Sequence, residues 1–212
     1  MDVFLIDHYD SFTHNVIDWL AGSDGVLAIH CVAWDDAPGL AKAANSHAPL
    51  VISPGPKSPN DVPPTMALLR QQLGLVPILG ICLGHQMLAA MSGARIVRGQ
   101  APHHGTARRI LVDAVKPGLL AGLAPSFAAG VYNSLVVEAI SLPPIWTINA
   151  RCDLGEVQAM SYSGGGAPAF GLQFHPESFL SQGADVIRAN WIAAVQAWRS
   201  AQESASQQGM VQ

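Results

Sequence analysis

One stretch near the middle of the chain constrains the fold more than any other. Residues 77–81 form a short apolar run without a helical period, which is typical of a buried strand. Residues 83–92 then carry apolar side chains at helical spacing. Cys82 therefore lies at the turn from strand to helix, between Gly80 and Gly84. Small neighbours are what a sharp strand-to-helix turn requires, so this Gly-x-Cys-x-Gly segment predicts a nucleophile elbow with cysteine in place of serine.

The predicted position gives Cys82 a chemical environment that an ordinary buried cysteine lacks. A thiol at a helix N-terminus faces unpaired backbone N–H groups and the positive end of the helix dipole, and both favour the thiolate. The backbone N–H of Leu83 is placed to donate to an oxyanion. A lone cysteine is more often an inert structural thiol, but the strand, the two glycines and the helix together favour a catalytic role.

Composition limits the classes of protein to which the chain can belong. It has 212 residues, of which 50% are hydrophobic and 12% charged, so we expect one large domain with a sizeable core. The net charge of -4 and the lack of a Lys/Arg run argue against nucleic acid as a partner. No apolar stretch reaches membrane-spanning length, and the N-terminus does not resemble a signal peptide.

The cysteines indicate a reducing compartment. Cys31, Cys82 and Cys152 are scattered, and their number and spacing suit neither a disulfide framework nor a metal site. We therefore expect a cytoplasmic protein in which Cys82 is a free thiol.

The first half of the chain alternates between strand and helix patterns. Strands are predicted at residues 3–6, 26–32 and 49–53, and helices at 16–20, 36–47 and 63–73. This order predicts an α/β fold with a doubly wound, mostly parallel sheet and helices on both faces. Ligands bind such sheets beyond the carboxyl ends of the strands.

The second half has a different texture, with short strand candidates separated by Gly/Pro turns. These candidates lie at residues 108–112, 130–137, 145–150, 156–162 and 169–174. We expect them to add antiparallel strands beside the parallel sheet. A final helix is predicted over 184–198. One domain then spans residues 1–199, and a flexible tail rich in Ser, Ala and Gln spans 200–212.

The predicted last strand ends in a second candidate for catalysis. Pro176 disfavours helical geometry at His175 and keeps it extended. In an extended segment residues i and i+2 point the same way, so His175 and Glu177 project together. That is the arrangement of a base and the carboxylate that orients it.

Four segments of the chain together resemble one enzyme family. Residues 80–86 (Gly-Ile-Cys-Leu-Gly-His-Gln) and 173–178 (Gln-Phe-His-Pro-Glu-Ser) resemble the two signatures of the class I (triad) glutamine amidotransferases. Residues 7–15 and 53–56 (Ser-Pro-Gly-Pro) narrow the likeness to the small glutaminase subunit, component II, of anthranilate synthase and aminodeoxychorismate synthase. The likeness runs from residue 2 to about residue 199 in matching order.

The resemblance implies a glutaminase that supplies ammonia to a chorismate-utilising synthase subunit. Cys82 would attack the side-chain amide of L-glutamine, His175 would move the proton, and Glu177 would orient the imidazolium. No metal or organic cofactor is implied. The substrate-binding positions that the resemblance implies are Gly55, Pro56, Lys57, Leu83, Gln86, Ser134 and Leu135.

Two positions depart from the family pattern. Lys57 replaces the second glycine of Pro-Gly-Pro-Gly, and a non-glycine residue would cost roughly 1–2 kcal/mol there if φ had to be positive. Asn133 stands where the family commonly has His.

The segment His103-His104-Gly105 could suggest a metal site, but without a third ligand at suitable spacing we expect a structural or interface role.

Several interpretations remain open from the sequence. The partner could be an anthranilate synthase, an aminodeoxychorismate synthase or a secondary-metabolite relative. The chain could also be a docking subunit that has lost glutamine turnover, although the intact Cys82, His175 and Glu177 argue against that. A stand-alone Cys hydrolase is disfavoured by Gln86 and Ser134, which such an enzyme would not need.

Overall fold

The computed structural model describes residues 1–22, 25–100 and 105–209. A nine-stranded mixed sheet forms its centre, in the order β2-β1-β3-β4-β11-β10-β9-β6-β7. The first five strands in this order are parallel, and the rest are antiparallel to their neighbours. A separate two-stranded sheet pairs β5 with β8. The predicted α/β class with a doubly wound parallel part and added antiparallel strands is confirmed.

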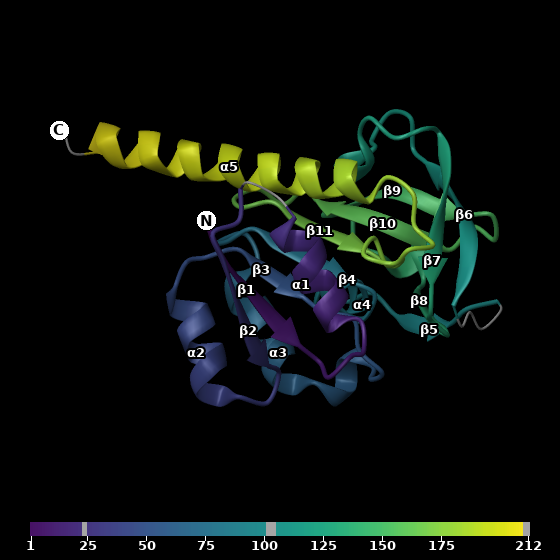
Figure 1. The fold of residues 1–212 in the computed structure, drawn as a ribbon, viewed down its shortest axis with the longest axis horizontal. Helices are drawn as coiled ribbons and strands as arrows, with labels where there is room; N and C mark the ends of the chain where they lie inside the picture. The colour runs from purple at the N-terminus through teal and green to yellow at the C-terminus, as the bar shows by residue number, and fades with distance from the viewer. Residues whose placement is uncertain (23–24, 101–104, 210–212) are drawn as a thin grey trace.

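The parallel strands alternate with helices through the first half of the chain (Figure 1). The strands are β1 (Asp2–Asp7), β2 (Ala28–Ala33), β3 (Leu50–Ile52), β4 (Ile78–Ile81) and β11 (Ala169–Leu172). The antiparallel strands are β10 (Val157–Tyr162), β9 (Trp146–Cys152), β6 (Thr106–Val112) and β7 (Ser126–Val131), and the small sheet is β5 (Ile96–Arg98) with β8 (Leu135–Val137). The α-helices are α1 (Thr13–Ala21), α2 (Ala37–Asn45), α3 (Pro63–Gln72), α4 (Leu83–Met91) and α5 (Ala184–Gly209), and short 3-10 helices cover Pro59–Asp61, Gly118–Leu120 and Ala139–Ser141.

Alternation along the parallel strands divides the core into two layers. On β1, Val3 and Leu5 face the cluster that includes α1 and α5, whereas Phe4 and Ile6 face the one that includes α2, α3 and α4. This follows because successive side chains of a strand point to opposite faces of the sheet. Both faces of β1 are therefore buried, as its continuous apolar run predicts.

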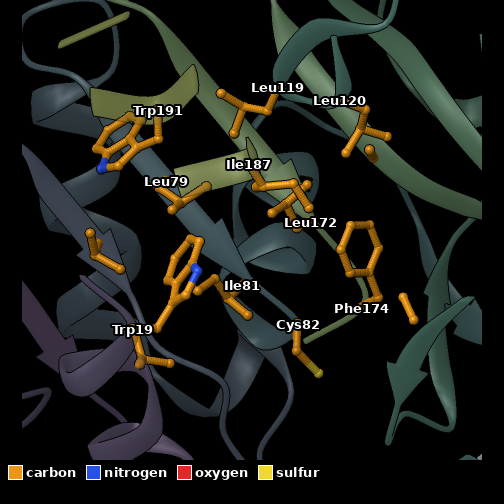
Figure 2. Packing of buried hydrophobic residues seen from close by; sticks show 14 of the residues in the cluster. Trp19, Leu79, Ile81, Cys82, Leu119, Leu120, Leu172, Phe174, Ile187 and Trp191 are labelled. Carbon is orange, nitrogen blue, oxygen red and sulfur yellow. The ribbon is translucent and has the colours of Figure 1, made fainter. Parts of the chain in front are cut away.

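The layer under α1 and α5 is anchored by two large aromatic side chains. Trp191 of α5 is fully buried and Trp19 of α1 nearly so. They lie beside Leu79 and Ile81 of β4, and Cys82 lies at the margin of the cluster with its sulfur directed away from these side chains (Figure 2). The core thus ends where β4 ends, and Cys82 marks its boundary with the site.

The structure differs from the sequence-based expectations at four places. Residues 130–137 are not one strand, because β7 ends at Val131 and β8 begins at Leu135, and β5 was not predicted. The segment 169–174 does not join the antiparallel part, since β11 pairs parallel with β4. Helix α5 runs to Gly209, so residues 200–209 are helical where a flexible tail was expected, and in Figure 1 its C-terminal part projects beyond the rest of the fold.

No helix in the described part of the chain is both long enough and apolar enough to cross a membrane.

A buried histidine fills the space between α4 and the centre of the sheet. His85 of α4 is fully buried, and a Cβ placed on Gly171 of β11 would lie 2.6 Å from its Nδ1. Glycine at position 171 therefore makes room for the imidazole ring. Burial lowers the pKa of His85 to about 4, against a smaller opposing effect of the Gly171 backbone. The ring is neutral at physiological pH and serves packing.

The neutral state of His85 predicts a specific acid sensitivity. Below pH 6.5 the unfolded chain takes up a proton at His85 while the folded chain does not until the pH approaches 4. Between pH 7.5 and pH 5 this should remove about 2 kcal/mol from the free energy of unfolding. Urea unfolding at both pH values should therefore show a smaller loss for His85→Gln than for the wild type. Equal losses in the two proteins would contradict this explanation.

Candidate active site

Cys82 occupies a strained backbone position between β4 and α4. It has φ 51° and ψ -98°, a positive φ that side-chain-bearing residues rarely adopt. Its N–H donates to the carbonyl oxygen of Leu172 in β11 at 2.7 Å, and its carbonyl accepts from the N–H of Gln86 at 3.1 Å. The sheet on one side and the helix on the other therefore hold this conformation in place.

The glycines that flank Cys82 are required by close backbone contacts. A Cβ on Gly80 would lie 2.5 Å from the carbonyl group of Gly84, and a Cβ on Gly84 would lie 2.6 Å from the carbonyl oxygen of Ile52. Neither position can hold a larger residue unless the backbone moves. The structure thus has the elbow geometry that the Gly-x-Cys-x-Gly spacing predicts.

His175 and Glu177 form a buried pair directly after β11. The His175 Nδ1 lies 2.7 Å from a carboxylate oxygen of Glu177, and both side chains are at most 2% exposed. The backbone of His175 is fixed as well, because its N–H donates to the carbonyl of Gly130 at 2.9 Å and its carbonyl accepts from Ser181 Oγ at 2.5 Å. The expected extended geometry ends at His175, because Pro176 and Glu177 lie in a turn in which the N–H of Ser178 donates to the His175 carbonyl at 3.1 Å. The turn still brings the two side chains together and fixes the orientation of the imidazole.

The charges around His175 outweigh its burial. Burial alone lowers the pKa of the imidazole, but the charge of Cys82 and its contact with the ring, followed by Glu177, raise it to about 10. Within the described residues, the Nε2 atom has no partner at hydrogen-bond geometry. The arrangement places a readily protonated imidazole between the sulfur of Cys82 and the carboxylate of Glu177, able to give a proton to a leaving group at Nε2.

A cavity of about 450 Å³ opens in front of Cys82, a volume within the range of small-molecule pockets. The seven predicted substrate-binding positions all line it, together with Cys82. Four lining residues were not predicted as site residues: Ser58, Asp61, Tyr132 and Asn133.

Gln86 and Gln173 form a polar wall beside the thiol. The Gln86 Nε2 donates to the carbonyl of Leu135 at 2.9 Å and to Gln173 Oε1 at 3.2 Å. The Gln173 Nε2 lies 3.7 Å from the Cys82 sulfur and donates to it, and the Gln173 side chain is fully buried. Sequence reasoning did not assign Gln173 to the site. The signal was available, since Gln173 stands two residues before His175 in an extended segment and so projects to the same side.

The loop after β3 approaches the elbow closely at Gly55. A Cβ there would lie 2.7 Å from Leu83 Cδ2 and 2.8 Å from His8 Cβ, so only glycine fits. His8 connects this loop to α3, because its ring nitrogens lie 3.1 Å from Ser53 Oγ and 3.1 Å from Thr65 Oγ1. Burial lowers the pKa of His8 to about 4, against a smaller opposing effect of Asp7.

Lys57 does not carry the backbone strain that its replacement of glycine could imply. It is not among the residues with positive φ. Its ammonium lies 5.0 Å from the centre of the Trp34 ring, at the distance of a cation–π contact. The substitution therefore ties the loop to the segment after β2.

Asn133 keeps one hydrogen-bonding group unused. Its Nδ2 donates to the carbonyl of Leu135 at 2.9 Å, while its Oδ1 is buried and has no partner among the described residues. Because Asn133 lines the cavity, this oxygen is a candidate acceptor for a ligand N–H group.

No group of three His, Cys, Asp or Glu side chains in the described ranges could hold a metal ion. His103 and His104 lie outside those ranges.

Comparison with known proteins agrees with this geometry. The chain is 34% identical over 197 residues to anthranilate synthase component 2 of Mycobacterium tuberculosis (91% of this chain, 82% of that protein). It is 36% identical over 193 residues to aminodeoxychorismate synthase component 2 of Escherichia coli (90% and 98%). It is also 34% identical over 190 residues to the bifunctional protein TrpGD of Thermotoga maritima, covering 90% of this chain but only 32% of that longer protein.

A solved structure shares the fold. A protein from Thermoplasma acidophilum, described as a GMP synthase subunit, superposes with a TM-score of 0.78 and 24% identity, covering 96% of this chain and 98% of that one. The sequence model of the family described as glutamine amidotransferase class-I matches residues 4–194, nearly the whole described domain. The chain therefore belongs to the class-I glutamine amidotransferase family.

Proposed function

We propose that this protein is the glutaminase subunit of a chorismate-utilising synthase, hydrolysing L-glutamine through a thioester on Cys82 and delivering the ammonia. The observation that carries the proposal is a cavity lined by the strained thiol of Cys82 and by the loop at Gly55. The buried pair of His175 and Glu177 lies behind the lining, where the His175 ring interacts with Cys82.

The proposed reaction uses these groups in sequence. The Cys82 thiolate attacks the side-chain amide carbon of glutamine, and the resulting oxyanion accepts hydrogen bonds from backbone N–H groups of Leu83 and the Gly55 loop. His175 gives its proton to the departing nitrogen, so that ammonia leaves and a thioester remains. Water, deprotonated by His175, then adds to the thioester and releases glutamate and the thiolate. Glu177 orients the imidazole throughout and stabilises its protonated form before and after the thioester stage.

The amino acid end of glutamine is proposed to bind at the opposite side of the cavity. Backbone groups of Ser134 and Leu135 are available there, and the free Oδ1 of Asn133 can accept from the substrate's ammonium. Gln86 contributes mainly by fixing the wall, because its amide group already donates to two partners. This assignment makes Asn133 a functional replacement at a position where the family commonly has His.

A separate synthase is proposed as the partner because free ammonia is largely protonated at neutral pH, and ammonium has no lone pair with which to attack. A docked synthase would receive ammonia directly. Relatives of both kinds, forming anthranilate or aminodeoxychorismate, are similar to the chain, so either product fits. A reducing cytoplasm is the proposed compartment, since it would keep Cys82 free.

The first prediction concerns the thiol. Cys82→Ser should abolish glutamate release from glutamine, alone and with a chorismate-utilising synthase, because an alcohol is a far weaker nucleophile here. The same variant should still co-elute with the synthase in size-exclusion chromatography, which shows that it folds and docks. Glutamate should be measured with both kinds of synthase. A wild type that binds either synthase without releasing glutamate would identify a docking subunit instead.

The second prediction concerns the carboxylate. Glu177→Gln keeps the shape of the side chain but removes the charge that favours the imidazolium. We expect kcat/KM for glutamine to fall by roughly 10²–10⁴-fold, by analogy with the loss of the orienting acid in a serine triad. Steady-state glutaminase assays measure this directly, and a decrease of less than tenfold would exclude the assigned role.

The third prediction concerns the unusual lysine. Removing the contact between Lys57 and Trp34 should loosen the loop and lower kcat/KM by about two- to fivefold, the size of an exposed cation–π contact. Lys57→Gly and Lys57→Met should both show it, and Lys57→Arg should retain most of the activity. Unchanged kinetics in the glycine variant would make Lys57 a neutral surface substitution.

A further inference from the structure

Two aromatic rings enclose the imidazole of His175. The centre of the Phe12 ring lies 5.1 Å from that of His175 at an interplanar angle of 60°. The centre of the Tyr132 ring lies 4.8 Å from it at 70°. Phe12 and Tyr132 also contact each other, with ring centres 4.6 Å apart. We call Phe12 and Tyr132 the ring pair.

Each ring is anchored independently of His175. Phe12 precedes α1, and its N–H donates to the Asp10 carboxylate at 2.8 Å. The neighbouring Thr13 hydroxyl donates to the carboxylate of Asp7, at the end of β1, at 2.6 Å. The loop that carries Phe12 is thus fixed to the parallel part of the sheet.

Tyr132 comes from the antiparallel part of the sheet. It follows β7 directly, and its hydroxyl lies 2.9 Å from Ser178 Oγ, a side chain in the same turn as His175 and Glu177. The phenol is therefore already engaged in a hydrogen bond. The ring pair therefore places one residue from the loop after β1 and one residue from the end of β7 against the same imidazole.

Within the part of the chain that the structure describes, the titratable groups that act on His175 are Cys82 and Glu177. Cys82 lies at the start of α4, and Glu177 belongs to the segment of His175 itself. The α1 side contributes the uncharged Phe12 ring, and the β7 side contributes Tyr132 and the Gly130 carbonyl. A cation over the face of an aromatic ring and within about 6 Å of its centroid is attracted to the ring, whereas the neutral imidazole gains less. Both contacts with His175 are T-shaped, the arrangement in which the edge of one ring points at the face of the other.

We propose that Phe12 and Tyr132 are positioning residues that hold the His175 imidazole toward Cys82 and stabilise its protonated form through two ring contacts. The inference rests on the glutaminase chemistry proposed above. It also assigns a role to the segment at residues 7–15, whose side chains are absent from the cavity lining. Because Phe12 does not line the cavity, its contribution is to the base and not to binding of the substrate.

The test replaces Phe12 by phenylalanines with increasing fluorination, which preserve ring shape but weaken the negative face of the ring. The readout is the NMR titration of His175 in the full chain, assigned with His175→Gln. We expect the titration midpoint to move down, reaching a total shift of about 0.4–0.7 pH unit for the most fluorinated ring. The kcat for glutamine should fall in step, while KM stays constant.

Two controls separate the ring effect from general packing. Fluorinated phenylalanine at Phe127, which packs edge-on against Phe174 in the core, should leave the His175 titration unchanged. Tyr132→Phe keeps the ring and should retain the titration midpoint, whereas Tyr132→Leu should lower it.

The proposal is overturned if the fluorinated series leaves the His175 midpoint where it is, even if Phe12→Leu lowers activity, because the ring would then act through packing alone. The titration needs no glutamine turnover. A wild type without glutaminase activity would refute the proposed function, yet it would still give a decisive answer on the ring pair.

Discussion

The parallel pairing of β4 with β11 is the interaction on which the site depends. Gly80 lies opposite Gly171, and the ladder continues past the end of β4, where the N–H of Cys82 donates to the carbonyl of Leu172 at 2.7 Å. Parallel neighbours end at the same edge of a sheet, so the residues that follow the two strands meet there. The thiol and the imidazole come together for this reason, although they are far apart in the sequence.

The same pairing explains where prediction from sequence succeeded and where it could not. The elbow at Cys82 is a local consequence of glycine spacing and was predictable. The pairing of His175 with Glu177 was predicted as well, but from strand alternation, whereas a turn after β11 brings the two side chains together. The strand that pairs with β11 was not predictable, because a short apolar run does not indicate which strand it will lie beside. The break at residues 132–134 did leave a signal, since Asn133 and Ser134 are turn-forming residues, but the apolar residues on both sides of it were given more weight.

Helix α5 illustrates a different limit. Its apolar side ends where the domain ends, and residues 200–206 beyond it are exposed. Periodicity reports burial and not helicity, so a helix that continues into solvent leaves no periodic signal. The residues of that extension include Ala, Gln and Glu, which have favourable helix propensity. The prediction of a tail gave this propensity too little weight.

Three buried histidines show how one side chain takes different states within one fold. His8, His85 and His175 all pay the cost of desolvation, which favours the neutral ring. His8 and His85 stay neutral, and His8 meets only the hydroxyl groups of Ser53 and Thr65 at its ring nitrogens. Of these three, His175 is the one whose pKa is raised by Cys82 and Glu177. A neutral His8 can support the Gly55 loop without adding a charge beside Cys82, whereas the mechanism proposed above needs the proton on His175. The positions of Cys82 and Glu177 therefore decide which histidine can serve as the proposed acid and base.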